Sequence, residues 1–399
     1  MGRLGTESAF EVLGRAKALE RSGREVIHLE IGEPDFETPQ HIRAAAAEAL
    51  ERGHTHYVPA PGIPELRVAV AEFLDRTGRM RTSPDRVVVT PGAKPIMFFT
   101  ILALCGDGDE VLYPDPGFPM YASIAAFAGA RPVPVPLRED NGFTIDPDEL
   151  ASLVTDRTKL LILNSPHNPC GSASTAEQVE AIAAIAIEHD LVVLSDEVYW
   201  ALRYDTELRH DTELRHDTEH SGHCSVLDVD GMADRTVLLD GWSKTFAMTG
   251  WRLGFGVFPD PLVEPITRLV INSVSCTSAF SQHAAIAALS GPWDEVSRMA
   301  AAFRERRDVI VDGLNAVPGV SCVQPAGAFY AFPNVREVGM PAAKLADLML
   351  EQAGVACLPG TAFGRHGEGY LRFSYANSIE NINAAMTAFG ALVSEVANG

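Results

Sequence analysis

Short runs of apolar and β-branched residues recur along the middle of the chain and predict buried strands. Several of the intervening stretches have apolar residues three and four positions apart, as in residues 174–190, where Ser174 or Thr175 caps a predicted helix. Strands that alternate with helices in this way predict an α/β fold, with a mostly parallel sheet covered on both faces. The predicted strands are residues 86–90, 110–113, 159–164, 191–195, 236–240 and 254–258.

The pattern changes after Phe280, where longer helices surround the segments AFYAF and YLRFSYA. This change predicts a smaller α+β domain in the C-terminal part of the chain, to which an N-terminal arm returns. The 399 residues, 46% of them hydrophobic, are enough for one large and one smaller core. The predicted boundaries give an arm at 1–40, a large domain at 41–289 and a small domain at 290–399.

The charge of the chain limits the kinds of partner it can bind. It has 53 acidic and 32 basic residues, a net charge of −21, which argues against a nucleic-acid surface because phosphates require clustered Lys and Arg. The six cysteines contain no CxxC pair, so neither a zinc site nor a disulfide framework is predicted. The charged start leaves no room for a signal-peptide core, and the apolar run from Ile96 is too short to span a bilayer. We therefore expect a protein of the reducing cytoplasm without a membrane partner or a bound metal.

Residues 205–220, DTELRHDTELRHDTEH, repeat a six-residue unit twice and then begin it again. The segment has no sustained apolar face, which predicts a solvated loop. The alternative is a metal site made by His210, His216 and His220, but a spacing of six does not place ligands on one helix face. We expect a surface loop, which either decorates the protein or affects access to a nearby pocket.

Polar residues follow four of the predicted strands. PGAK follows residues 86–90, SPHNPCG follows 159–164, DEVYW follows 191–195 and GWSK follows 236–240. Each segment alone has an ordinary explanation, such as a turn at Asn168, a helix cap at Asp196 or a solvated lysine at Lys244. In an open parallel sheet, ligands bind outside the carboxyl ends of the strands, so the segments together predict one pocket.

The segments NSPHNPCG, SDEVY and SKTFAMTGWRLG, in this order and spacing, resemble the fold-type-I pyridoxal-phosphate aminotransferases of class I, and bacterial aspartate aminotransferases among them. With GEPDF near the start and LRFSYA near the end, the similarity extends over almost the whole chain. The resemblance implies a mostly parallel seven-stranded sheet between helices, and pyridoxal 5'-phosphate as cofactor. It also implies amino acid and 2-oxo acid substrates and a homodimer with shared active sites.

The same resemblance explains why SKTFAMTGWRLG holds two cations in a stretch that is otherwise short of charge. It implies that Lys244 forms a Schiff base with the cofactor aldehyde and later moves a proton at the substrate α-carbon. It implies that Arg252 binds the cofactor phosphate, because a planar guanidinium can form two hydrogen bonds with phosphate oxygens. The Ser243 hydroxyl is implied to bind the same phosphate. Further phosphate donors are implied at the start of the predicted helix, at Gly92, Ala93 and Lys94.

The cofactor ring has other implied neighbours. Asp196 matches the aspartate that pairs with the pyridine nitrogen, and Tyr199 and Asn168 match groups that bond its phenolic oxygen. Phe118 either stacks on the ring, as in the family, or packs in the core. Tyr57 matches a tyrosine that reaches the cofactor phosphate of the neighbouring subunit, which is the basis of the implied homodimer.

The resemblance also implies substrate contacts. Arg372 matches the clamp for the α-carboxylate, although its place in a strand would also permit a solvated side chain. Gly32 fits a position where the backbone approaches the substrate, the alternative being an ordinary turn. Asn168 is a further implied substrate contact. Lys94 resembles the lysine with which some bacterial aspartate aminotransferases read a side-chain carboxylate, the alternative being an exposed lysine.

Three functions are consistent with these residues. The first is transfer of an amino group, from a donor such as aspartate or glutamate to a 2-oxo acid, in two half-reactions. The second keeps the cofactor and Lys244 but ends in elimination, cyclisation or β/γ-replacement on an amino acid such as S-adenosylmethionine. The third is a ligand-sensing regulator, which would need a DNA-binding domain for which the chain has neither the length before Gly32 nor the basic surface.

Overall fold

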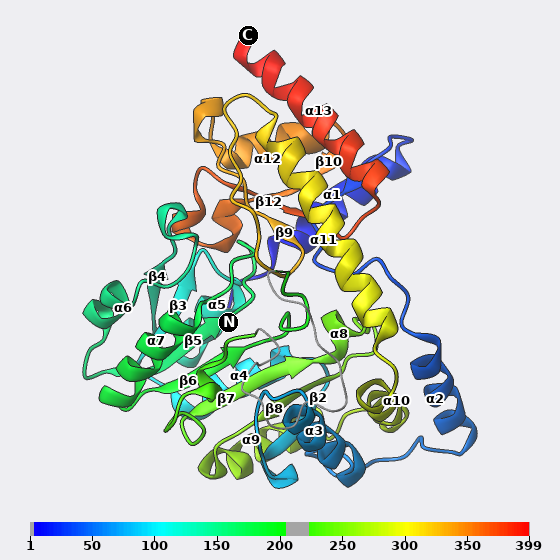
Figure 1. The fold of residues 1–399 in the computed structure, drawn as a ribbon, viewed down its shortest axis with the longest axis vertical. Helices are drawn as coiled ribbons and strands as arrows, with labels where there is room; N and C mark the ends of the chain where they lie inside the picture. The colour runs from blue at the N-terminus through cyan, green and yellow to red at the C-terminus, as the bar shows by residue number, and fades with distance from the viewer. Residues whose placement is uncertain (1–3, 205–222, 399) are drawn as a thin grey trace.

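A computed structural model describes residues 4–204 and 223–398 and contains a central seven-stranded sheet (Figure 1). The strand order is β2-β8-β7-β6-β5-β3-β4. Strands β7, β6, β5, β3 and β4 pair in parallel, whereas β8 runs antiparallel to both of its neighbours. The predicted α/β fold is confirmed. The strands are β2 Val87–Thr90, β3 Glu110–Asp115, β4 Arg131–Pro136, β5 Thr158–Asn164, β6 Val192–Asp196, β7 Thr236–Gly241 and β8 Gly254–Val257.

Strand β4 is the one strand of this sheet that the hydrophobic pattern did not predict. Its sequence, RPVPVP, contains three prolines, each of which lacks the amide hydrogen that a central strand donates to its neighbour. The structure places β4 at the edge of the sheet, where it pairs with β3 alone. Prolines are tolerated on an edge strand, so the sequence is compatible with this position although it does not read as a strand.

Successive residues of the strands contribute to cores on opposite faces of the sheet, as the pleat requires. Ile162 of β5 packs in a cluster with Ile96 of α4, whereas its neighbour Leu161 packs in another cluster with Ile182 of α7. Helix α7 begins at a capping box in which the Thr175 hydroxyl accepts a hydrogen bond from the Gln178 amide. The helices therefore cover both faces, as the alternating pattern predicted.

The helices of the chain have the following bounds: α1 Ser8–Arg21, α2 Gln40–Glu51, α3 Pro64–Arg76, α4 Lys94–Leu104, α5 Met120–Ala128, α6 Pro147–Leu153, α7 Ala176–Glu188, α8 Trp242–Thr245, α9 Asp260–Ser273, α10 Ala279–Ser290, α11 Asp294–Asn315, α12 Ala342–Glu351 and α13 Ile379–Asn398. Among the described residues, no helix has the length and apolar character that a membrane crossing requires.

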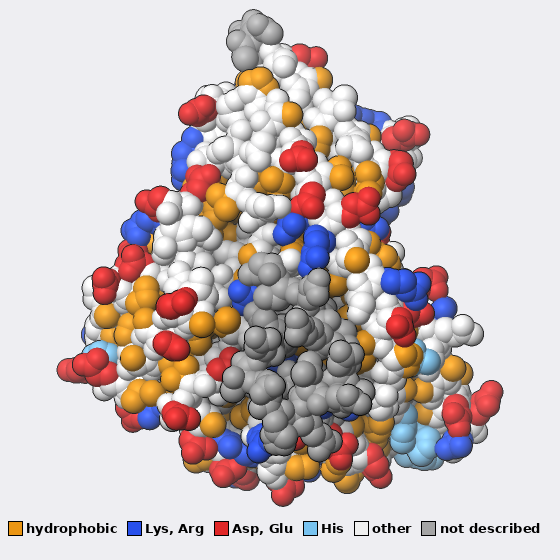
Figure 2. Space-filling view, in the orientation of Figure 1, with side chains coloured by type: hydrophobic (Ala, Val, Ile, Leu, Met, Phe, Trp, Pro, Cys, Tyr) orange, Lys and Arg blue, Asp and Glu red, His pale blue; other side chains and the backbone are white. Residues whose placement is uncertain are grey.

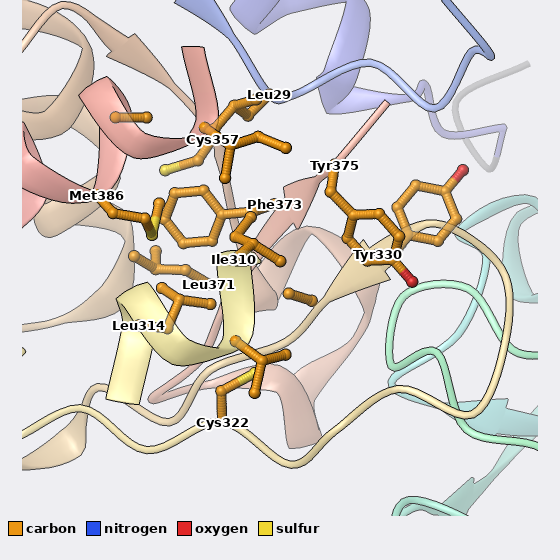
Figure 3. Close-up of a cluster of buried hydrophobic side chains, with 14 of the residues drawn as sticks. Leu29, Ile310, Leu314, Cys322, Tyr330, Cys357, Leu371, Phe373, Tyr375 and Met386 are labelled. Carbon is orange, nitrogen blue, oxygen red and sulfur yellow. The ribbon is translucent and has the colours of Figure 1, made fainter. Parts of the chain in front are cut away.

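A second region of structure lies above the central sheet in Figure 1 and carries α11, α12 and α13. Its short strands form two small sheets, and the pairing of β1 with β10 brings the N-terminal segment into this region. Side chains of α11, β12 and α13, among them Ile310, Phe373 and Met386, meet in one buried cluster (Figure 3). The domain boundaries at residues 41 and 290 stay a prediction. The short strands are β1 Ile27–His28, β9 Tyr330–Ala331, β10 Val355–Ala356, β11 Leu358–Pro359 and β12 Leu371–Ser374.

The surface agrees with the acidic composition of the chain. Acidic and basic side chains are interspersed over the described part of the face in Figure 2. The repeat at 205–220, and with it the alternative metal site at His210, His216 and His220, lies outside the described residues.

Candidate active site

A cavity of about 500 Å³ lies where the polar segments that follow the central strands meet. The volume is in the range of pockets that hold a small-molecule ligand together with its cofactor. Segments after β2, β5, β6 and β7 all reach it, so the pocket predicted from the strand ends is present. The predicted residues that line it are Gly32, Ala93, Lys94, Phe118, Asn168, Asp196, Tyr199, Ser243, Lys244, Arg252 and Arg372.

The antiparallel direction of β8 explains how Arg252 joins this group. The amino end of β8 lies beside the carboxyl ends of its neighbours, since Gly254 pairs with Gly241 of β7 and with Thr90 of β2. Arg252, two residues before β8, therefore comes to the same edge of the sheet as Lys244 of α8. The short helix α8 follows β7 directly and fixes the start of the Lys244 side chain.

The Lys244 amine lies on the wall of the cavity. Its Nζ donates a hydrogen bond to the Gly32 carbonyl oxygen over 2.5 Å. Removal of water by the surrounding protein lowers the pKa of Lys244 from 10.5 to about 8, and nearby cations, Arg372 first among them, act in the same direction against the Glu33 carboxylate. A larger share of this amine is therefore neutral near pH 7 than in a solvated lysine, and the neutral form is the nucleophilic one.

Asp196 is a buried acid at the end of β6. Burial raises its pKa to about 6, and a hydrogen bond from the Tyr121 hydroxyl, 2.7 Å from Oδ2, acts in the opposite direction. Tyr121 lies on α5, is fully buried, and was not among the residues predicted for the site. A carboxylate that is buried in this way favours a cationic partner, which would replace part of its lost hydration.

Two tyrosines face each other on the wall of the cavity. The hydroxyl groups of Tyr199 and Tyr330 are 2.7 Å apart, and both side chains are buried. Gly32 passes directly beside them, because a Cβ atom at this position would lie 2.0 Å from the Tyr330 hydroxyl. Only glycine fits this close approach to Tyr330, and an approach of the Gly32 backbone to the substrate stays a prediction.

Arg372 is a buried guanidinium on β12, so the solvated alternative for it is wrong. Strand alternation does not expose it because β12 is covered on both faces and Leu371 and Phe373 are buried as well. The rings of Tyr330 and Phe363 lie 4.5 and 4.8 Å from its carbon Cζ. Its hydrogen bonds go to the Glu30 carbonyl oxygen and, over 3.2 Å, to Oδ1 of Asn168, which are both neutral acceptors. Burial lowers the pKa of Arg372, and its Nε is buried without a partner in the described residues, so the site favours an anionic ligand.

A second corner of the cavity carries a cation beside the start of a helix. It contains the exposed Arg252 guanidinium, the Ser243 side chain and the start of α4 at Ala93. Gly92 lies against Arg252, since a Cβ atom there would be 2.2 Å from the guanidinium nitrogen Nη2. The first amides of a helix have no partner within the helix, so they can bind an anion beside the guanidinium.

The floor of the site is held by a buried ion cluster. Arg79 donates to Glu197 over 2.7 Å and to Asp240 over 2.6 Å, and all three side chains are buried. Glu197 follows Asp196 in the chain, and Asp240 lies on the adjacent strand, three residues before Ser243. The cluster joins the ends of β6 and β7 next to residues that face the cavity. Removal of Arg79 would take a buried cation from both acids, although Glu197 would keep hydrogen bonds from the Ser195 and Ser225 hydroxyls.

Among the residues predicted for the site, Lys94 and Tyr57 have surroundings that the sequence did not predict. Lys94, in the first turn of α4, forms an ion pair with Glu7 at the start of α1, and its Nζ lies 5.5 Å from the centre of the Phe118 ring. Its side chain is half exposed, which agrees with the alternative of an exposed lysine, and it is also paired with Glu7. The Tyr57 side chain is 89% exposed and does not line the cavity of its own chain.

The sequence did not predict several residues that line the cavity. Glu7 and Phe10 come from the N-terminal arm, Tyr121 from α5 and Tyr330 from β9. In the sequence these residues lie in ordinary helical or apolar surroundings, and only the fold brings them to the strand ends. Two segments gave a signal: DPGFPMY contains Tyr121 together with the predicted Phe118, and AFYAF contains Tyr330.

Comparisons with known proteins agree with this geometry. Residues 24–389 match the family model described as aminotransferase class I and II. An aspartate aminotransferase of Pyrococcus abyssi is 43% identical over 91% of this chain and 90% of its own length. The aromatic-amino-acid aminotransferase 2 of Thermococcus litoralis is 41% identical over 90% of each chain. The structure of Thermus thermophilus aspartate aminotransferase with maleate superposes with a TM-score of 0.88 at 35% identity, covering 98% of this chain and 97% of the other.

Proposed function

The chain belongs to the class I and II aminotransferases, and on that premise we propose that its amino donor is aspartate or glutamate. The family uses pyridoxal 5'-phosphate and exchanges an amino group between an amino acid and a 2-oxo acid, so the protein is a transaminase. The relatives do not favour the alternative of elimination, cyclisation or replacement chemistry, since those described above are named as aminotransferases. The role of each residue and the identity of the substrate are proposals.

The residues present fit this cofactor. A partly desolvated amine, Lys244, faces the same cavity as a buried acid, Asp196, and an exposed arginine beside the start of α4, Arg252. These are the partners that an aldehyde, a ring nitrogen and a phosphate require. The lack of a side chain at Gly32 and Gly92 leaves room for the Tyr330 hydroxyl and the Arg252 guanidinium at these two points. When bound, the cofactor supplies an aldehyde for covalent capture of amines and a ring that accepts electrons from the α-carbon.

Lys244 is proposed to hold the cofactor covalently and then to move a proton at the substrate α-carbon. Its lowered pKa supports both tasks, since a neutral amine is a nucleophile and a base at neutral pH. Asp196 is proposed to keep the ring nitrogen protonated, and the Tyr199 and Asn168 side chains to orient the opposite edge of the ring. Arg252 and Ser243, with the backbone of Gly92, Ala93 and Lys94, are proposed to bind the phosphate, and Phe118 to lie against the ring.

The substrate is proposed to bind between two cations. Arg372 would bind the α-carboxylate, because it is buried and its present hydrogen-bond acceptors are neutral. Lys94, on the other side of the cavity, would bind the side-chain carboxylate of aspartate or glutamate. The observation that carries the proposal is this pair of cations in one cavity with Lys244. The structure of the Thermus thermophilus aspartate aminotransferase with maleate, a dicarboxylate, supports the same substrate class.

A screen of amino donors and 2-oxo acid acceptors tests the proposal. We expect the holoenzyme to convert aspartate or glutamate to its 2-oxo acid, with stoichiometric formation of the amino form of the acceptor. Transamination of neutral amino acids alone would reject the dicarboxylate proposal and keep the transaminase. S-adenosylmethionine should be included, because its consumption without transfer of an amino group would favour the second chemistry.

We also propose that the protein is a homodimer that functions in a reducing compartment. The exposure of Tyr57 supports the first point, because the proposed role of this side chain is to reach the cofactor phosphate of the partner subunit. The six cysteines, all present as free thiols, support the second. Light scattering of the purified holoenzyme would test the dimer, and a monomer that is fully active would contradict it.

Replacement of Tyr121 by phenylalanine should make cofactor binding more sensitive to acid. The Tyr121 hydroxyl bond lowers the pKa of Asp196, so its loss should raise that pKa further above its value of about 6. The carboxylate would then be protonated at a higher pH. We expect the cofactor to bind about tenfold more weakly at pH 6, with a smaller loss at pH 8, in spectroscopic titrations. An equal loss at both pH values would mean that Tyr121 acts only through packing.

A further inference from the structure

The N-terminal arm places a carboxylate where the proposed function places a ligand. Glu7, Ala9 and Phe10 line the same cavity as Lys244 and Arg372, and the Glu7 carboxylate is bound to the Lys94 amine. Lys94 is the residue proposed to bind the side-chain carboxylate of the substrate. The arm thus supplies the Lys94 amine with the same chemical group that an acidic substrate would bring.

The Glu7 side chain is held in this position by the fold. Only 18% of it is exposed, against 50% for Lys94, so the carboxylate points into the protein and the amine remains reachable from solvent. The backbone amide of Gly5 donates to the Ser123 hydroxyl of α5 over 2.8 Å, which fixes the segment just before Glu7. Helix α1 begins at Ser8 and fixes the segment just after it. A partly buried carboxylate with a partner of this kind leaves it only for another cation or for water.

The negative charge of Glu7 extends to the rest of the substrate site. Arg372 and Tyr330 both lie close enough for the Glu7 carboxylate to affect them. Burial has the largest effect on each, since it lowers the pKa of Arg372 and raises that of Tyr330, and Glu7 acts to raise both. A second carboxylate brought in by a substrate would therefore be repelled by Glu7 as well as excluded from Lys94.

We infer that Glu7 is a specificity-determining residue, because its carboxylate is paired with the Lys94 amine. Acidic substrates must displace this carboxylate, whereas apolar substrates need not. With the pair intact, the charges of Lys94 and Glu7 cancel, and the Phe10 and Phe118 side chains offer an apolar wall beside them. Substrates with apolar or aromatic side chains then bind without breaking an ion pair. This inference rests on the proposed role of Lys94. Glu7 then sets the ratio of kcat/KM between acidic and apolar substrates.

The test is the Glu7→Gln variant, which keeps the size of the side chain and removes its charge. We expect kcat/KM for aspartate and glutamate to rise about three- to tenfold, through a lower KM, while kcat/KM for phenylalanine is unchanged or falls. Binding of two unreactive probes to the holoenzyme, measured by calorimetry, should show the same change: tighter for maleate and not for 3-phenylpropionate. The matched control is Glu11→Gln, which removes an exposed carboxylate of α1 that accepts a hydrogen bond from the Thr6 hydroxyl and lies outside the cavity lining.

A second background separates a specificity role from a structural one. In Lys94→Met protein, Glu7→Gln should no longer change the ratio of acidic to aromatic substrates, because the displaced partner is absent. An equal loss for both substrate classes in Glu7→Gln protein would overturn the inference, since it would mean that Glu7 only anchors the arm. A wild-type enzyme that transaminates both classes, with a ratio that Glu7→Gln leaves unchanged, would also overturn it while the proposed function stands. If the wild-type enzyme transaminates neither class, the proposed function itself fails.

Discussion

Replacement of Lys244 by alanine should lower transamination by at least about 10⁴-fold and leave the protein folded. The variant loses both the amine that captures the cofactor and the base at the substrate α-carbon, each of which contributes a large factor to the rate. The fold should tolerate the change because Lys244 donates one hydrogen bond, to the Gly32 carbonyl oxygen, and carries a charge that the site disfavours. Turnover with the best amino donor, and the thermal unfolding midpoint with and without cofactor, are the measurements.

Lys244→Arg is the matched control for the charge. It keeps a cation at the wall of the cavity, but a guanidinium is protonated throughout the accessible pH range and is neither a nucleophile nor a base. We expect it to be as inactive as Lys244→Ala, which would show that the neutral amine is needed rather than the charge. An alanine variant that retains a tenth of the activity would remove Lys244 from the centre of the mechanism.

Replacement of Arg372 by alanine should have the second largest effect, mainly on substrate binding. Loss of a buried cation that pairs with the α-carboxylate is worth about 2 to 5 kcal/mol, or roughly 30-fold to several thousand-fold in KM. The cofactor should still bind, because its proposed partners Lys244, Asp196 and Arg252 are unchanged. Steady-state kinetics for one amino donor, together with cofactor content by absorbance, give both numbers.

Two further variants control this prediction. Arg372→Lys keeps the charge but loses the planar fork that contacts two oxygen atoms, so we expect an intermediate KM. Arg336→Ala removes another arginine of the same region, one whose guanidinium lies on the Tyr370 ring rather than in the cavity, and should leave KM unchanged. A normal KM in Arg372→Ala protein would mean that another group binds the α-carboxylate.

The sequence predicted much of the site because four polar segments follow buried strands, and parallel strands bring their carboxyl ends together. Lys244, Asp196 and Asn168 could be placed in one pocket on this ground alone. Strand β4 was not predicted because its prolines do not read as a strand, and only its place at the sheet edge permits them. Local patterns therefore predicted the mostly parallel sheet, but they did not predict its edge strand β4.

The rest of the site depends on contacts between residues far apart in the chain. Glu7 reaches Lys94 across 87 positions, and Tyr199 meets Tyr330 across 131 positions. No local pattern of charge or periodicity marks these pairs, because each partner has an ordinary place in its own helix, loop or strand. For Arg372, strand alternation left burial open, and only the covering of both faces of β12 decides it.

The central claim is that the cofactor is held covalently by Lys244. The most direct test is reduction of the holoenzyme with borohydride, followed by digestion and mass spectrometry of the peptides. We predict a cofactor-derived mass on the peptide that contains Lys244, and its loss when the digestion follows reduction of Lys244→Ala protein. A cofactor adduct on another lysine, or no adduct in protein saturated with cofactor, would contradict the account.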